Sequence, residues 1–124
     1  MKAIVPENLS WQPSECGSHC VLLEEATTRV EMLELQPGAV IEPHSHKEQR
    51  IFICFVRSGG ALLYLGGRLF RPQAGQTFEC EPGDVLAFNN DTPHVTRVLL
   101  TRVGYKAGDR VADGKTWAEL TASI

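Results

Sequence analysis

Two histidines separated by a single residue, His44 and His46, lie near the middle of the chain, and His94 follows far downstream. Side chains two positions apart on an extended strand point to the same face, so this spacing can aim two imidazoles at one point. Neutral imidazole is the commonest protein ligand for zinc, iron, copper and nickel. The chain has 4 histidines in all, and three fall in this pattern, which indicates a metal site.

The segments around these histidines are typical of an all-β protein. Short apolar runs alternate with turns rich in glycine and proline, residues that supply or preset the φ angles that turns need. We expect strands at residues 20–24, 29–35, 51–57, 61–65, 68–70, 76–80, 84–88 and 95–106, and a short helical period at 116–122. So many closely spaced strands predict a sandwich or a small barrel. By size, the 124 residues form one domain, with its barrel core at about residues 20–106.

Composition excludes several classes of protein. The 12 basic and 15 acidic residues give a net charge of −3, and no cluster of lysine and arginine predicts a nucleic-acid partner. No apolar run is long enough for a signal peptide or a membrane span, so we expect a cytoplasmic protein that does not enter membranes. The 4 cysteines are then expected to be reduced thiols.

Two longer motifs resemble those of the cupin family. The segment from Gly38 to His46, with Gly59 beyond it, is similar to the first cupin motif, G-x5-H-x-H-x3,4-E-x6-G. The segment from Gly83 to His94, with its Pro-Gly-Asp and Pro-His pairs, is similar to the second, G-x5-P-x-G-x2-H-x3-N. The resemblance implies a double-stranded β-helix, or jelly-roll barrel, that is often a homodimer.

The same resemblance implies a ligand set. In cupins the two motifs face one another inside the barrel, so His44, His46 and His94 would carry over as ligands of one divalent transition metal: iron, nickel, zinc, manganese or copper. The family's glutamate ligand should follow the second histidine by four or five positions, where this chain has Arg50 and Ile51. Asn89, Asp91 and Val98 also replace the second motif's proline, glycine and asparagine.

Residues near the position of the expected glutamate are candidates for several roles in the site. A local bulge could turn Glu48 or Gln49 inward, so Gln49, Glu48 or a water molecule is the candidate fourth metal ligand. Glu48 is also the candidate general acid or base. Arg50 or Arg57 could bind a substrate carboxylate through its planar guanidinium. Their alternative role is that of solvated charges at a sheet edge or a dimer interface.

Three classes of function follow from these residues. The first is a metal-dependent enzyme, either a non-haem iron dioxygenase or a lyase or isomerase, that acts on a small carboxylate or enolisable compound. Three imidazoles without a carboxylate would favour an anionic substrate, and the glutamine that sugar-acid-processing cupins use in place of glutamate keeps that activity open. The second is a cupin that binds or senses a small ligand, in which any metal is structural. The histidines could alternatively be polar residues that fill the barrel mouth. The third is a dimerising accessory or storage module.

Overall fold

The computed structural model of the chain describes residues 3–57, 59–122 and 124. Its strands are β1 (Gln12–Ser14), β2 (Gly17–Glu25), β3 (Thr28–Leu35), β4 (Val40–His46), β5 (Arg50–Arg57), β6 (Leu62–Leu65), β7 (Arg68–Phe70), β8 (Thr77–Cys80), β9 (Leu86–Asn89), β10 (Thr96–Val103) and β11 (Arg110–Ala112). A 3-10 helix, η1 (Pro6–Asn8), precedes β1, and a short α-helix, α1 (Trp117–Thr121), follows β11. The all-β prediction is confirmed.

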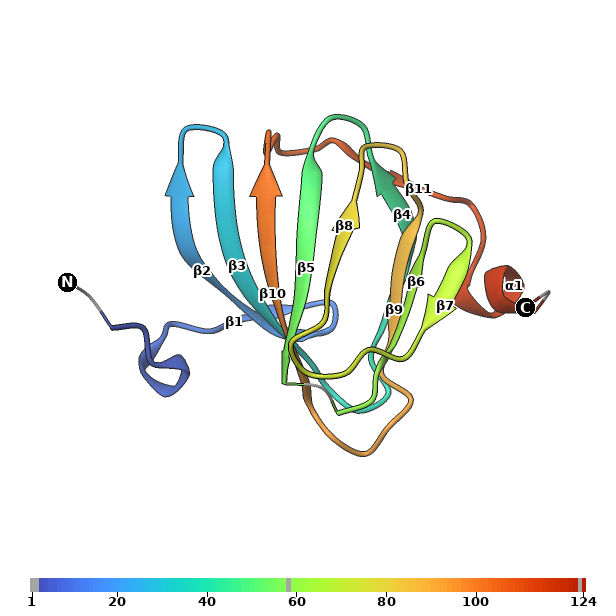
Figure 1. Cartoon of the computed structure of the whole chain (residues 1–124), viewed down its shortest axis with the longest axis horizontal. Helices are drawn as coiled ribbons and strands as arrows, with labels where there is room; N and C mark the ends of the chain where they lie inside the picture. Colours follow the sequence, from blue (N-terminus) through green and yellow to red (C-terminus); the bar gives the residue numbers. More distant parts are fainter. Residues whose placement is uncertain (1–2, 58, 123) are drawn as a thin grey trace.

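The strands form two antiparallel sheets. One has the order β1-β2-β3-β10-β5-β8 and the other β11-β4-β9-β6-β7. From β3 onward the chain passes back and forth between the sheets, with only the β6–β7 hairpin staying on one of them (Figure 1). This alternation is the arrangement of a jelly-roll barrel, or double-stranded β-helix, and the predicted fold class is confirmed.

Strand alternation places the core between the sheets. On β5, Ile51, Ile53 and Phe55 are at most 1% exposed, whereas Phe52 and Cys54 between them are partly exposed. This period of two is what a strand with one buried face requires. The buried hydrophobic cluster comprises Cys16, Leu33, Leu35, Ile41, Ile51, Ile53, Phe55, Ala61, Leu63, Cys80, Leu86, Phe88, Val98 and Leu100.

Strand β3 departs from this alternation. Glu31, Met32 and Leu33 are buried one after another, so this part of the strand is buried on both faces. The register of its neighbour β2 shifts between Val21 and Leu23, as at a β-bulge. The carboxylate of the buried Glu31 faces the barrel interior.

Both ends of the chain add strands beyond the expected barrel core. Strand β1 pairs with β2, and β11 pairs with β4, with Arg110 opposite His46. Each is only 3 residues long, too short for an alternating pattern to reveal it. Between β6 and β7 the chain turns at Gly66 and Gly67, and both adopt the positive φ that a tight hairpin requires and that glycine allows. The organisation as one domain stays a prediction.

The barrel has two different ends. In Figure 1 the β4–β5 loop and the connection from β10 to β11 lie at the upper end, and the β9–β10 loop lies at the lower end. The register agrees, because Val40 at the start of β4 pairs with Asn89 at the end of β9, whereas His46 at the end of β4 pairs with Arg110. The histidine pair therefore belongs to the end that the β10–β11 connection covers.

Candidate functional site

Strand β4 holds His44 and His46 side by side inside the barrel. The two residues are 5% and 7% exposed. Their ring centroids are 5.1 Å apart, and the two ring planes make an angle of 85°. On the neighbouring strands, Leu86 of β9 pairs with His44 and Arg110 of β11 pairs with His46. The structure thus brings the two histidines together, as their spacing predicts.

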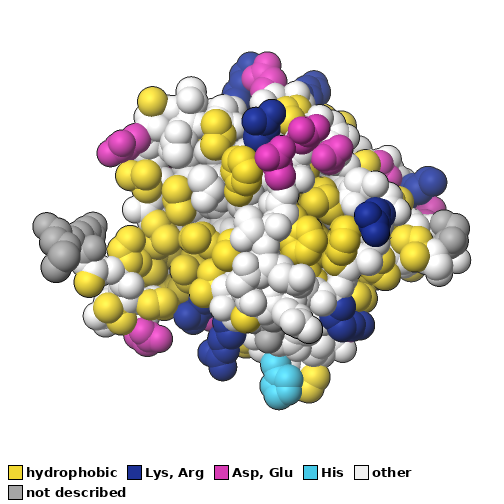
Figure 2. Space-filling model, in the orientation of Figure 1, with side chains coloured by type: hydrophobic (Ala, Val, Ile, Leu, Met, Phe, Trp, Pro, Cys, Tyr) yellow, Lys and Arg dark blue, Asp and Glu magenta, His cyan; other side chains and the backbone are white. Residues whose placement is uncertain are grey.

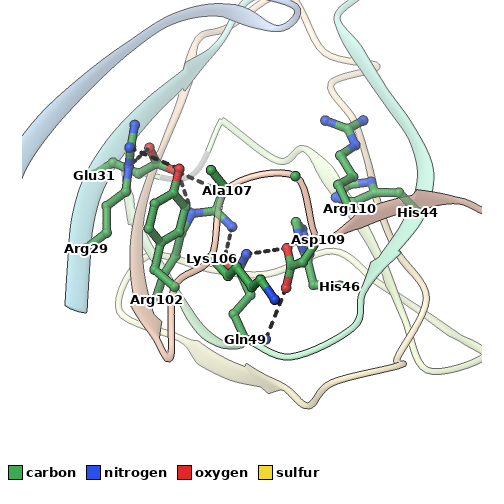
Figure 3. Close-up of a pocket in the computed structure, with 12 residues that line it drawn as sticks. Arg29, Glu31, His44, His46, Gln49, Arg102, Lys106, Ala107, Asp109 and Arg110 are labelled. Atoms are coloured by element: carbon green, nitrogen blue, oxygen red, sulfur yellow. Dashed lines mark hydrogen bonds and ion pairs between the residues drawn. The ribbon is translucent and has the colours of Figure 1, made fainter. Parts of the chain in front are cut away.

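A cavity of about 240 Å³ opens beside the two imidazoles. Its walls come from β3, β4, β10 and the segment that leads into β11, and Figure 3 shows how these side chains converge. The lining residues are Arg29, Glu31, His44, His46, Gln49, Arg102, Tyr105, Lys106, Ala107, Gly108, Asp109 and Arg110. Four of them are cationic and two are anionic, so with neutral histidines the lining carries a net charge of +2.

Asp109 is the centre of the first of two polar networks. Its Oδ1 accepts hydrogen bonds from His46 Nδ1 at 2.9 Å and from Gln49 Nε2 at 2.7 Å, while its Oδ2 accepts the backbone amides of Glu48 and Gln49 at 3.2 Å each. The chain can turn inward here because Gly108, just before Asp109, adopts a φ of 80° that other residues rarely adopt. The aspartate therefore fixes both the His46 ring and the β4–β5 loop.

Glu31 is the centre of the second network. It accepts hydrogen bonds from Arg102 Nε at 2.7 Å and from Arg29 Nε at 3.2 Å. Arg102 also donates to Gln49 Oε1 at 2.9 Å, and Gln49 in turn donates to Asp109, so its amide joins the two networks. Such linked buried polar groups hold each other in one arrangement.

The hydrogen bonds at the two imidazoles imply their tautomers. His44 Nδ1 lies 2.8 Å from the Glu42 carbonyl oxygen, and His46 Nδ1 lies 2.9 Å from the Asp109 carboxylate. Both partners only accept hydrogen bonds, so Nδ1 carries the proton in each ring and Nε2 keeps its lone pair. His46 Nε2 is buried and has no hydrogen-bond partner within the described part of the chain.

Burial keeps both rings neutral. It lowers the pKa of His44 to about 4, against the bond to the Glu42 carbonyl and with the help of the Arg110 charge. It also lowers the pKa of His46 below the usual 6.5, although the hydrogen bond to Asp109 opposes that effect. Burial alone would raise the pKa of Asp109, but the hydrogen bonds from His46 and the loop amides lower it to about 2.

His94 lies apart from this pair. It is exposed and belongs to the β9–β10 loop at the other end of the barrel. The Asn90 side chain donates to its carbonyl oxygen at 2.7 Å, and a Cβ at Gly59 would lie 3.1 Å from its Cβ. Because β10 runs from Thr96 at this end to Arg102 at the cavity, a rise of about 3.3 Å per residue separates the ends by about 20 Å. The structure therefore does not assemble the expected three-histidine site.

The other predicted site residues divide between the cavity and the surface. Gln49 is 2% exposed and lines the cavity, but both ends of its amide are bound to Asp109 and Arg102. Glu48 is half exposed and lies 3.3 Å from Lys106 Nζ. Arg50 is also half exposed, 3.8 Å from Glu79. Neither Glu48 nor Arg50 lines the cavity, because strand alternation turns the side chain of Arg50 outward.

The donor set does not fit the predicted metal. Two imidazoles offer lone pairs, but the residue directly across from His44 is the apolar Leu86. Among residues 3–57, 59–122 and 124, no group of three or more His, Cys, Asp or Glu side chains is placed to hold a metal ion. In addition, the positive charges of Arg102 and Arg110, which disfavour a proton on these rings, would repel a divalent cation there.

Several cavity residues escape prediction from the sequence. Glu31 and Arg29 stand two positions apart on one strand, and this charged pair within an apolar run is a signal that could have marked the inner face. Arg102 lies two positions after the apolar Leu100, and this spacing could likewise have marked it as a residue of the inner face. Asp109 sits in a loop between a glycine and an arginine, a context that carries no sign of its buried place.

Comparisons with known proteins agree with the fold. The family model described as "Cupin domain" matches residues 31–101, and no curated protein sequence matches the chain. The polyketide cyclase RemF from Streptomyces resistomycificus superposes with a TM-score of 0.78 at 16% identity, over 99% of this chain and 92% of that one.

Two further solved structures have the same architecture. KdgF from Halomonas sp. has a TM-score of 0.75 at 18% identity, over 86% of this chain and 96% of its own. A predicted oxalate decarboxylase from Thermotoga maritima has a TM-score of 0.74 at 14% identity, over 82% and 98%. At these identities the likeness concerns the fold alone, but the family model covers more than half of the sequence. The chain therefore belongs to the cupin family.

Proposed function

We propose that this cupin is an isomerase or lyase that binds a small anionic molecule at the barrel mouth and moves a proton with His46. The observation that carries the proposal is the state of His46. Its Nδ1 is held by the Asp109 carboxylate at 2.9 Å, while its buried Nε2 has no partner among the described residues. A lone pair in this position accepts a proton or a hydrogen bond from a ligand.

The charges around His46 support an anionic ligand. The cavity lining carries a net charge of +2, and Arg102 and Arg110 stand next to the imidazoles. Both guanidinium groups already bind carboxylates: Arg102 Nε lies 2.7 Å from Glu31, and Arg110 Nη1 lies 2.6 Å from Glu15. A ligand carboxylate would share or replace these partners through the parallel N–H groups. When a proton leaves a carbon next to a carboxylate or carbonyl, the same cations stabilise the negative charge that develops on oxygen.

Asp109 supports the transfer of the proton itself. A carboxylate that binds Nδ1–H keeps the ring in the tautomer with a free Nε2 and stabilises the imidazolium once it forms. The proton can then return to another atom of the substrate, as in an isomerase, or follow a leaving group, as in a lyase. His46 thus takes the role of base that the sequence suggests for Glu48.

A metal-dependent dioxygenase is the less favoured function. Cupin proteins often bind a metal ion, but here two histidines stand next to cations and a leucine. The proposed reaction therefore involves no metal ion. Elemental analysis of the purified protein checks this point, because one equivalent of iron, nickel, zinc, manganese or copper per chain, lost in His44→Ala, would restore the metal-dependent alternative.

Proton exchange tests the proposed function without knowledge of the true substrate. The protein is incubated in deuterium oxide with a panel of small 2-oxo and 3-oxo acids, and proton NMR follows loss of the signal next to the carbonyl. We expect catalysed exchange for at least one acid, a loss of at least about 100-fold in His46→Gln, and unchanged exchange in the surface variant Arg50→Gln. Exchange that is absent throughout, or equal in His46→Gln, contradicts the proposal.

Homodimer formation and a cytoplasmic location stay predictions. Exposed hydrophobic side chains include Leu23, Val56 and Val103, which are 42%, 45% and 45% exposed, and Figure 2 shows hydrophobic side chains gathered on the side where Figure 1 places β2. Sedimentation equilibrium would give twice the chain mass for a dimer and the single mass otherwise. None of the helices in the described residues is long and apolar enough to cross a membrane.

A further inference from the structure

A second cavity adjoins the first and leads into the barrel core. It has a volume of about 90 Å³, and His44, Arg102 and Arg110 line both cavities. These three residues therefore stand at the junction. A ligand whose anionic group lies near Arg102 and Arg110 can extend past His44 into the second cavity.

The inner wall of this second cavity is apolar. Its hydrophobic lining residues are all buried, at 2% to 9% exposure, and all belong to the core cluster. They are Cys16, Leu33, Ile41, Leu86, Phe88 and Leu100. The polar lining residues Ser14 and Glu15 come from β1 and the turn after it.

The second cavity is a partly open recess whose volume limits what it can hold. About 90 Å³ corresponds to roughly three water-sized groups at about 30 Å³ each. A water molecule against the apolar wall finds no hydrogen-bond partner on that wall, because the polar lining residues lie elsewhere around the cavity. An apolar group of about three carbon atoms fits both the volume and the chemistry of the wall.

From these two cavities we propose that the substrate is a small carboxylate with a short apolar tail, and that Leu86 and Leu100 set the length of the tail. The inference rests on the proposed function, since it places the anionic group at Arg102 and Arg110. It also separates this chain from enzymes of sugar acids, whose hydroxyl groups would be left without partners against the leucines.

A homologous series of linear carboxylates tests the inference directly. Acetate, propionate, butyrate, pentanoate and hexanoate are titrated into the full chain and followed by calorimetry, with gluconate as a hydroxylated probe of similar length to hexanoate. We expect affinity to rise roughly fourfold per methylene up to a tail of about three carbons, and then to level off. Gluconate should bind more weakly than butyrate.

Variants of one wall residue sharpen the test. Leu86→Ala should move the plateau to a tail about two carbons longer, and Leu86→Phe should move it to acetate. Leu63 is a matched control because it is 0% exposed, belongs to the same core and does not line the cavity. Leu63→Ala should keep the wild-type plateau, and thermal melts establish that each variant is folded.

The outcomes distinguish the two proposals. Affinities that depend on Arg102 but not on tail length would contradict the proposed apolar tail, and so would gluconate binding tighter than butyrate. Neither result would contradict the proposed function. An absence of binding by every carboxylate, or binding unchanged in Arg102→Gln, overturns the anion site and the tail with it. The wild-type series alone decides the matter if a leucine variant does not fold.

Discussion

Acid should destabilise this protein through His44. Burial lowers the pKa of that imidazole from 6.5 to about 4, whereas in the unfolded chain it stays near 6.5. Between these two values the unfolded chain binds a proton that the folded protein does not bind. The free energy of unfolding therefore falls as the pH drops from 6.5 toward 4, and above 6.5 this contribution is constant.

The size of the effect follows from the pKa difference. At about 1.4 kcal/mol per pH unit, His44 alone removes about 2 kcal/mol of stability between pH 6.5 and pH 5. Its side chain is buried, so solvent screens little of this contribution. His46 has a lowered pKa as well and acts in the same direction.

Urea unfolding at pH 5, 6, 7 and 8, followed by circular dichroism, measures this dependence. The comparison is between the wild type and His44→Gln, whose amide does not titrate but can still donate to the Glu42 carbonyl. We expect the loss of stability between pH 7 and pH 5 to be about 2 kcal/mol smaller in the variant. Equal losses in the two proteins would refute the burial argument for His44.

Four further predictions follow from the site. Asp109→Asn should lower the free energy of unfolding by about 3 kcal/mol, because charged hydrogen bonds at a buried centre are lost; a change below about 1 kcal/mol in urea unfolding would show that Asp109 does not hold the loop. Asp91→Asn, which breaks a surface ion pair with Arg71 at 2.9 Å, should cost less than about 1 kcal/mol by the same measurement, and a larger loss would mean that exposure does not screen this pair. Burial lowers the pKa of His46 below the usual 6.5. For a substrate found in the exchange assay, kcat/KM should therefore not yet fall as the pH drops to 6.5, and its midpoint should lie at a lower pH. A midpoint above 6.5 would exclude neutral His46 as the base. Dialysis against zinc or iron(II) followed by removal of free metal should leave less than one equivalent per chain, and the thermal midpoint should not rise with added metal; a stoichiometric metal that raises it contradicts the donor analysis.

The sequence predicts the barrel well because its signals are local. Alternation along β5 and paired glycines at Gly66 and Gly67 each depend on a few neighbouring residues. The spacing of His44 and His46 is local too, and the structure places both imidazoles at one point. Patterns of this kind survive folding because each strand must turn one face to the core.

The predictions that fail concern contacts between segments that are far apart in the sequence. The spacing from Gly83 to His94 resembles a motif, but strand β9 ends at Asn89 and the chain turns at the far end of the barrel, where Asn90 binds the His94 carbonyl. Asp109 escapes prediction for the opposite reason, because only the return of the chain from β10 to β11 carries it to His46. No spacing along the sequence specifies either distance.

The protonation state and tautomer of His46 test its proposed role as the base most directly. Nitrogen-15 NMR of labelled protein at pH 7 distinguishes the two neutral tautomers and the imidazolium, and His46→Gln assigns the signal. We expect a neutral ring with the proton on Nδ1 and a free Nε2, and a change in the proportion of the two tautomers in Asp109→Asn. A proton on Nε2, or an imidazolium at pH 7, would contradict the proposed role.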